Sequence, residues 1–268
     1  MTHPSLSGPR RTVQLEDATL AYLDTGGTKP AVLLLHGAYL SKREWRAQTA
    51  GLCSRFRIIA PDLRAHGDSG RQGRPYSVQQ FARDIETLLD SLGVEHAHVC
   101  GHSLGGMVAM QLACTRPERV RSLVLAETSY GTSSTRVEAT LSAWSRPLFR
   151  RASLRWQARM FAQTLSKHTP ELHAYLEEEI LKYADDRGTY DGIWDAVLAF
   201  DGRARLAGIH RPSLVVVGER NRQTHRQGRA ISSLIPGARL KVLPAAGHML
   251  NMDQPAAFND LLLDFWSA

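Results

Sequence analysis

Cysteine is scarce in this chain, and long hydrophobic runs are absent from it. The three cysteines are an odd number without metal-type spacing, so neither a disulfide framework nor a cysteine metal centre is expected. No run approaches the roughly 20 apolar residues that cross a membrane, and residues 1–11 lack the apolar core of a signal peptide. We therefore expect a cytoplasmic protein without a membrane span.

Motifs for binding phosphate or nucleic acid are also missing. There is no G-x-x-x-x-G-K-[ST] and no G-x-G-x-x-G that opens a nucleotide-binding unit. The net charge of +7 is spread along the chain without a basic tail or a groove-reading motif. The sequence thus predicts no cofactor, no metal and no nucleic-acid partner. It leaves a small-molecule substrate, in a monomer or a homodimer.

Short apolar runs alternate with helical segments along most of the chain. This order is typical of a mostly parallel sheet covered by helices on both faces. The predicted strands span 19–24, 31–35, 57–60, 97–100, 122–126, 213–217 and 239–243, and the predicted helices 42–53, 78–92, 104–115, 224–234 and 255–266. The expected fold class is therefore α/β.

Residues 131–205 interrupt this alternation. The segment has helical patterns but no β-type run, and it contains Trp144, Trp156 and Trp194, three of the five tryptophans. A helical excursion between two strands predicts a lid over the carboxyl edge of the sheet, where open α/β folds bind ligands. We expect a core formed by residues 1–130 and 206–268 with a lid inserted at 131–205.

The sequence GHSLGG at 101–106 contains G-x-S-x-G between a predicted strand and a predicted helix. A serine in such a sharp turn is strained, and strand and helix pack closely only if its neighbours lack side chains. Gly101 and Gly105 supply that room. The turn exposes the hydroxyl of Ser103, which is the candidate nucleophile.

Two further loops follow predicted strands and should reach the same edge of the sheet. His248 lies in a small-residue loop after the strand 239–243, where it can act as a general base toward Ser103. His36-Gly37-Ala38 follows the strand 31–35. The backbone N–H groups of Ala38 and Leu104 can bind the oxyanion of a tetrahedral intermediate.

Five ordered motifs carry a resemblance to a known superfamily. They are HGAYL, PDLRAHGDSG, GHSLGG, LVVVGE and LPAAGHMLNMDQP. In this order they resemble the α/β-hydrolase superfamily, specifically its lid-bearing esterase, lactonase and carbon–carbon-bond hydrolase branch. The resemblance implies Ser103 as nucleophile, His248 as base, and the Ala38 and Leu104 amides as the oxyanion hole.

One residue departs from the pattern of that superfamily. Most of its members place an Asp three residues after the glycine that closes the strand 213–217, and that position is Asn221 here. An amide can orient the imidazole of His248 but carries no charge. Glu127, which follows the strand 122–126, is the preferred acid, as in members that place it after this earlier strand. Asn221 without a charge, or another acid such as Glu219 or Asp253, remains the alternative.

These residues predict a serine hydrolase with a Ser103–His248–Glu127 triad and an acyl-enzyme. Its expected substrate is an ester, thioester or lactone with a medium-sized apolar group. Acyl transfer to an alcohol and carbon–carbon cleavage of a diketone would use the same residue types. Because Asn221 is not an acid, a ligand-binding or weakly active protein of this fold is a further alternative.

Overall fold

A computed structural model describes residues 11–131 and 151–267 of the chain. Its sheet has eight strands in the order β1-β2-β4-β3-β5-β6-β7-β8. β1 and β2 run antiparallel to their neighbours, and the pairs from β4 to β8 are parallel. The strands are β1 (Arg11–Gln14), β2 (Thr19–Asp24), β3 (Ala31–Leu35), β4 (Arg57–Pro61), β5 (Ala97–His102), β6 (Val120–Ala126), β7 (Ser213–Gly218) and β8 (Arg239–Leu243). The prediction of a mostly parallel α/β sheet is confirmed.

Helices cover both faces of this sheet, which explains why its central strands are continuous apolar runs. In β3, Leu33 and Leu35 belong to one core cluster, while Val32 and Leu34 belong to the other. The helices α2 (Val78–Ser91), α3 (Leu104–Thr115) and α8 (Arg222–Leu234) pack on the first face, and α1 (Arg46–Leu52) and α10 (Pro255–Ser267) on the second.

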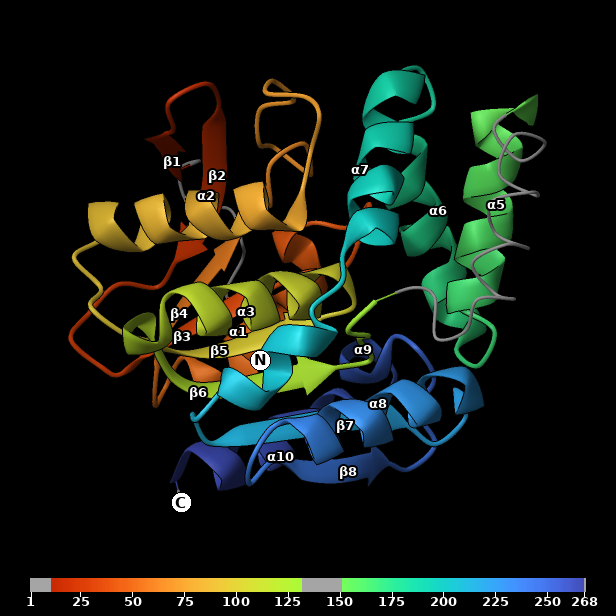
Figure 1. Ribbon diagram of the computed structural model, residues 1–268. Coiled ribbons are helices and arrows are strands. Elements are labelled where there is room, and N and C mark those ends of the chain that lie inside the picture. The colour runs from red at the N-terminus through yellow and green to blue at the C-terminus, as the bar shows by residue number, and fades with distance from the viewer. Residues whose placement is uncertain (1–10, 132–150, 268) are drawn as a thin grey trace.

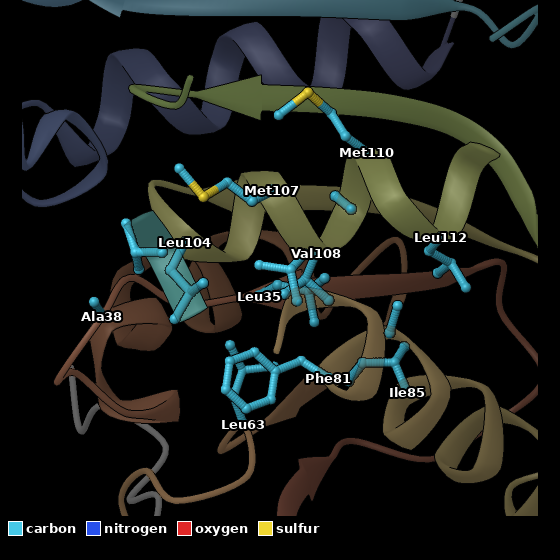
Figure 2. Close-up of a cluster of buried hydrophobic side chains, with 14 of the residues drawn as sticks. Leu35, Ala38, Leu63, Phe81, Ile85, Leu104, Met107, Val108, Met110 and Leu112 are labelled. Carbon is cyan, nitrogen blue, oxygen red and sulfur yellow. The ribbon is translucent and has the colours of Figure 1, made fainter. Parts of the chain in front are cut away.

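The helix α3 is buried on all sides, unlike the amphipathic α2. Figure 2 shows Val108 of α3 beside Leu35 of β3 and Phe81 of α2, in the middle of the first cluster. A helix that is apolar all round has to be enclosed by other elements. Its first residue, Leu104, is thereby fixed at the edge of the sheet.

Among the residues described between β6 and β7, three α-helices lie in the segment predicted to be an all-helical insertion. They are α5 (Leu154–Leu165), α6 (His173–Leu181) and α7 (Arg187–Ala199), and they are called the inserted helices below. The side chain of Ser153 caps α5, and that of Asp186 caps α7, each by accepting a backbone N–H of the first turn. Figure 1 shows them grouped beyond the end to which the arrow of β6 points. Trp144 lies outside the described residues.

Some local predictions were incomplete. β1 was not predicted, because it is a short edge strand with mostly exposed residues and gains its structure from pairing with β2. The predicted helix 42–53 is divided into a 3-10 turn, η1 (Lys42–Trp45), and α1, and a short helix, α9 (Leu250–Asp253), precedes α10. Over the described ranges, no helix is long and apolar enough to cross a membrane.

Candidate active site

The five predicted site segments follow five parallel strands, and the structure brings them to one edge of the sheet. Ala38 follows β3, Ser103 follows β5, Glu127 follows β6, Asn221 follows β7 and His248 follows β8. The carboxyl ends of parallel strands meet at the same edge. All five residues line one cavity of about 540 Å³.

Ser103 occupies a strained turn between β5 and α3. Its φ of 50° and ψ of −115° lie outside the regions that non-glycine residues favour. A Cβ on Gly101 would overlap the backbone of Gly105, and a Cβ on Gly105 would overlap the carbonyl of Leu35. The glycines on both sides of the serine are therefore required for the close approach of strand and helix.

Two hydrogen bonds join the backbone of this turn to the end of β6 and the residues after it. The N–H of Ser103 donates to the carbonyl of Ala126 at 3.0 Å, and the hydroxyl of Thr128 donates to the carbonyl of Ser103 at 2.6 Å. Among the described residues, the N–H groups of Ala38 and Leu104 donate no hydrogen bond. Two donors at the cavity wall are thus free for a ligand oxygen.

Glu127 is a buried carboxylate with three partners, and it also has a positive φ of 47°. One oxygen, Oε1, accepts the N–H of Gly218 at 2.5 Å. The other, Oε2, accepts the side-chain amide of Asn221 at 2.6 Å and lies 3.3 Å from Nδ1 of His248. The structure therefore brings the predicted acid within hydrogen-bond distance of the predicted base.

Asn221 lies against both Glu127 and His248, and it donates to Glu127. Its Nδ2 lies 3.3 Å from Nδ1 of His248, but that amide group donates to Glu127. Nδ1 of His248 also faces this carboxylate, which can only accept a hydrogen. The imidazole tautomer that satisfies this contact carries its hydrogen on Nδ1 and a lone pair on Nε2. Asn221 thus orients the carboxylate, and the carboxylate orients the ring.

The other two acids weighed as triad members bind the backbone of the His248 loop. Glu219 accepts the N–H of Ala245 at 2.9 Å, and Asp253 accepts the N–H of Gly247 at 2.7 Å. Asp253 also accepts the hydroxyl of Thr169, which ties this loop to the segment after α5. These contacts hold the loop in place and leave the imidazole to Glu127 and Asn221.

A buried ion pair beside the site was not predicted from the sequence. Glu44 and His102 are fully buried, and Oε1 of Glu44 lies 2.8 Å from Nδ1 of His102. The oxygen lies off the direction of the N–H bond, so this is an ion pair without an aligned hydrogen bond. Nε2 of His102 lies 2.9 Å from the carbonyl of His248, and Oε2 of Glu44 accepts the N–H of Gly37 at 2.9 Å.

The pair stabilises the charged form of both groups. Burial alone lowers the pKa of His102, but the Glu44 carboxylate outweighs it and raises that pKa above its usual value. Burial alone raises the pKa of Glu44, and His102 reverses the direction. The only sequence signal was the position of His102 next to Ser103; nothing indicated Glu44 as its partner.

The cavity has an apolar wall and a basic end. Its apolar side chains include Phe161 and Leu165 of α5, Trp194 and Val197 of α7, and Met107 of α3. The basic side chains are Lys167, His168, Arg220 and Arg222. In the part of the chain that the structure covers, no cluster of His, Cys, Asp and Glu is arranged to hold a metal ion.

Comparison with known proteins places this architecture in a family. The family model described as alpha/beta hydrolase fold matches residues 30–255. A putative carbamate hydrolase, RutD, of Azorhizobium caulinodans is 33% identical over 93% of this chain and 95% of its own length. A hydrolase from Pseudomonas aeruginosa superposes with a TM-score of 0.86 and 31% identity, covering 98% of this chain and 100% of that structure. The enol-lactonase of Burkholderia xenovorans superposes with a TM-score of 0.83 and 25% identity, covering 96% and 100%. The chain belongs to the alpha/beta hydrolase fold family.

Proposed function

We propose that this protein is a serine hydrolase that cleaves an ester, thioester or lactone through an acyl-enzyme. Oγ of Ser103 attacks the carbonyl carbon while Nε2 of His248 takes its proton. The N–H groups of Ala38 and Leu104 bind the oxyanion. The imidazolium then protonates the leaving oxygen or sulfur. Water, deprotonated by His248, attacks the acyl carbon and releases the acid and Ser103.

The contact between Glu127 and His248 carries this proposal. A general base needs a partner that fixes its tautomer and stabilises the imidazolium, and an ionised carboxylate does both. Asn221 leaves the usual position of that carboxylate uncharged, which was the reason for weighing a binding protein. Glu127 supplies a negative charge from the neighbouring strand, 3.3 Å from Nδ1.

The inserted helices fit the role of a lid in this proposal. Phe161 and Trp194 line the cavity from α5 and α7. Tyr39, the residue after the oxyanion donor Ala38, stacks on Tyr190 of α7 at 4.4 Å between ring centroids, and its hydroxyl donates to the Tyr190 carbonyl at 3.0 Å. The apolar wall suits a hydrocarbon portion of the substrate. The names of the carbamate hydrolase and the enol-lactonase agree with carbonyl hydrolysis.

Labelling with a fluorophosphonate probe tests the nucleophile, and hydrolysis of 4-nitrophenyl butyrate tests turnover. The probe should label the wild type at Ser103 and leave Ser103→Ala unlabelled. Ser129→Ala is the matched control, because Ser129 also lines the cavity, and it should still label. A wild type that neither labels nor turns over esters would refute the proposal and favour a binding protein. Labelling with cleavage of a dienol-type diketone, but not of esters, would favour carbon–carbon hydrolysis.

A further inference from the structure

The basic end of the cavity is built from two segments that are far apart in the sequence. Lys167 and His168 follow α5, whereas Arg220 and Arg222 flank Asn221 at the start of α8. Nη1 of Arg220 lies 3.4 Å from the carbonyl of His168, which joins the two segments. Three lysine and arginine side chains therefore border one end of the cavity.

Among the residues that the structure describes, no acid at the cavity wall neutralises these charges. Among the described lining residues, Glu127 is the single carboxylate, and Gly218, Asn221 and His248 occupy its oxygens. The acids of the adjoining segments, Glu219 and Asp253, accept backbone N–H groups of the His248 loop. Within residues 11–131 and 151–267, no ion pair forms between a carboxylate and Lys167, Arg220 or Arg222.

We propose that the substrate carries a carboxylate that binds at this basic end, with its hydrocarbon portion along the apolar wall. Guanidinium groups match the geometry of a carboxylate, and a cleft lined by charges of one sign attracts the opposite charge. A cavity of about 540 Å³ has room for such a bifunctional molecule beside Ser103. This inference rests on the proposed hydrolase function and narrows its substrate to anionic esters or lactones.

Two esters with equal acyl length test the inference. Mono-4-nitrophenyl pimelate carries a terminal carboxylate, and 4-nitrophenyl heptanoate ends in a methyl group. The wild type should show a higher kcat/KM for the anionic ester, by up to about 25-fold, since two exposed ion pairs contribute up to about fivefold each. Raising the ionic strength from about 0.01 M to about 1 M shortens the Debye length from about 30 Å to about 3 Å and should reduce this preference.

Charge removal identifies which side chains are responsible. Arg220→Gln and Arg222→Gln should each lower the ratio of the two kcat/KM values by about fivefold, and the double variant by more. Arg229→Gln is the matched control: Arg229 is an exposed arginine on α8 outside the cavity lining, so the same loss of net charge should leave the ratio unchanged. An unaltered ratio in the double variant, or a wild-type preference for the neutral ester, would refute the carboxylate inference. Failure of both esters together with failure of probe labelling would instead refute the hydrolase function.

The buried carboxylate of Glu44 supports a second inference, independent of the basic end. Nε2 of His102 lies 2.9 Å from the carbonyl oxygen of His248 and therefore carries a hydrogen, and the Glu44 oxygen 2.8 Å from Nδ1 favours a second hydrogen on that nitrogen. His102 is then an imidazolium paired with Glu44. The pair connects Gly37, which precedes the oxyanion donor Ala38, to the backbone of the base His248.

We infer that Glu44 and His102 are positioning residues for the proposed hydrolysis, which hold the oxyanion loop and the His248 loop at a fixed separation. Glu44→Gln keeps the shape of the side chain but removes the charge. It should lower kcat for 4-nitrophenyl butyrate by about 10- to 100-fold with KM within about threefold, because oxyanion contacts form only in the transition state. His102→Gln should show the same division between kcat and KM.

Glu179→Gln is the matched control for this change. Glu179 of α6 is equally buried and accepts Arg43 and Lys182, but it does not line the cavity. Removing the charge of Glu179 should lower the melting temperature without changing kcat. Labelling of Ser103 by the fluorophosphonate, measured as the labelled fraction, separates a slow site from a misfolded one. A raised KM with unchanged kcat in Glu44→Gln, or an equal loss of kcat in the control, would refute the positioning role.

Discussion

Replacing Glu127 by glutamine should nearly abolish turnover while leaving substrate binding intact. The reason is that the two oxygens of the carboxylate have different hydrogen-bond partners. Oε1 faces the N–H of Gly218, so the amide oxygen of a glutamine must occupy that position. Its NH2 group would then face the side-chain amide of Asn221 and Nδ1 of His248, which both donate hydrogens to Glu127. The imidazole would have to place its lone pair on Nδ1 and its hydrogen on Nε2, and this tautomer cannot accept the proton of Ser103.

The expected loss follows from comparable substitutions and from the distance involved. In serine proteases, changing the triad Asp to Asn lowers kcat about 10⁴-fold, or roughly 5 kcal/mol in activation free energy. The contact between Oε2 and Nδ1 is long here, at 3.3 Å, and a hydrogen bond to a charged group contributes about 1.5–3 kcal/mol. We therefore expect kcat to fall between about 10²- and 10⁴-fold. KM should change little, since the carboxylate acts on the transition state.

Steady-state hydrolysis of 4-nitrophenyl butyrate measures both constants, and the labelling rate of Ser103 reports the nucleophile directly. Asn221→Ala is the matched variant, because it removes one donor to the carboxylate and leaves its charge. It should lower kcat by less than about 100-fold, the effect of one hydrogen bond to a charged group. If Glu127→Gln stays within tenfold of the wild type while Asn221→Ala loses 100-fold or more, the assignment of the acid is wrong and Asn221 is the effective partner of His248.

Three further predictions concern the stability of the folded protein. Gly105→Ala should prevent stable folding or lower the melting temperature sharply, because the added Cβ would overlap the carbonyl of Leu35; a soluble variant with the wild-type melting temperature would contradict this. Burial lowers the pKa of His98 to about 4, and the charges of Arg121 and His96 act in the same direction. As the pH falls from about 6.5 to 4, His98 therefore binds a proton in the unfolded state before it does so in the folded state. The free energy of unfolding should drop over that window by up to about 3 kcal/mol, and titration of His98→Gln should show a smaller drop. Tyr39→Phe removes the hydroxyl bonded to the Tyr190 carbonyl and should reduce stability by about 1 kcal/mol in urea unfolding, whereas an unchanged midpoint would show that this bond contributes nothing.

The central strands β3 to β7 could be predicted from the sequence because most of their residues are buried, with helices on both faces of the sheet. Val32 and Leu34 face one cluster and Leu33 and Leu35 the other, so the run itself indicates a central strand. β1 gave no such signal, since its Arg11–Gln14 residues are mostly exposed and depend on a partner strand. Buried residues therefore give the strongest local signal, although the other edge strand, β8, was predicted despite its mostly exposed residues.

The same limit applies to the candidate site. Ser103 is marked by the glycines beside it, which are neighbours in the sequence. Glu44 and His102 are separated by nearly sixty residues and come together only because η1 turns the carboxylate inward beside β5. A helix prediction over 42–53 gave no reason to place one residue of its first turn against β5.

The register of β6 and β7 explains how the proposed acid can follow β6 instead of β7. β6 and β7 are parallel neighbours, with Ala126 level with Val216, so the residue after β6 emerges beside the end of β7. The N–H of Glu127 donates to the carbonyl of Val216, and its side chain then reaches the N–H of Gly218 and the amide of Asn221. The longer side chain of glutamate spans the remaining distance between the strands. A carboxylate can therefore approach His248 from either strand, provided that the other strand supplies donors to hold it, and Gly218 and Asn221 are those donors here.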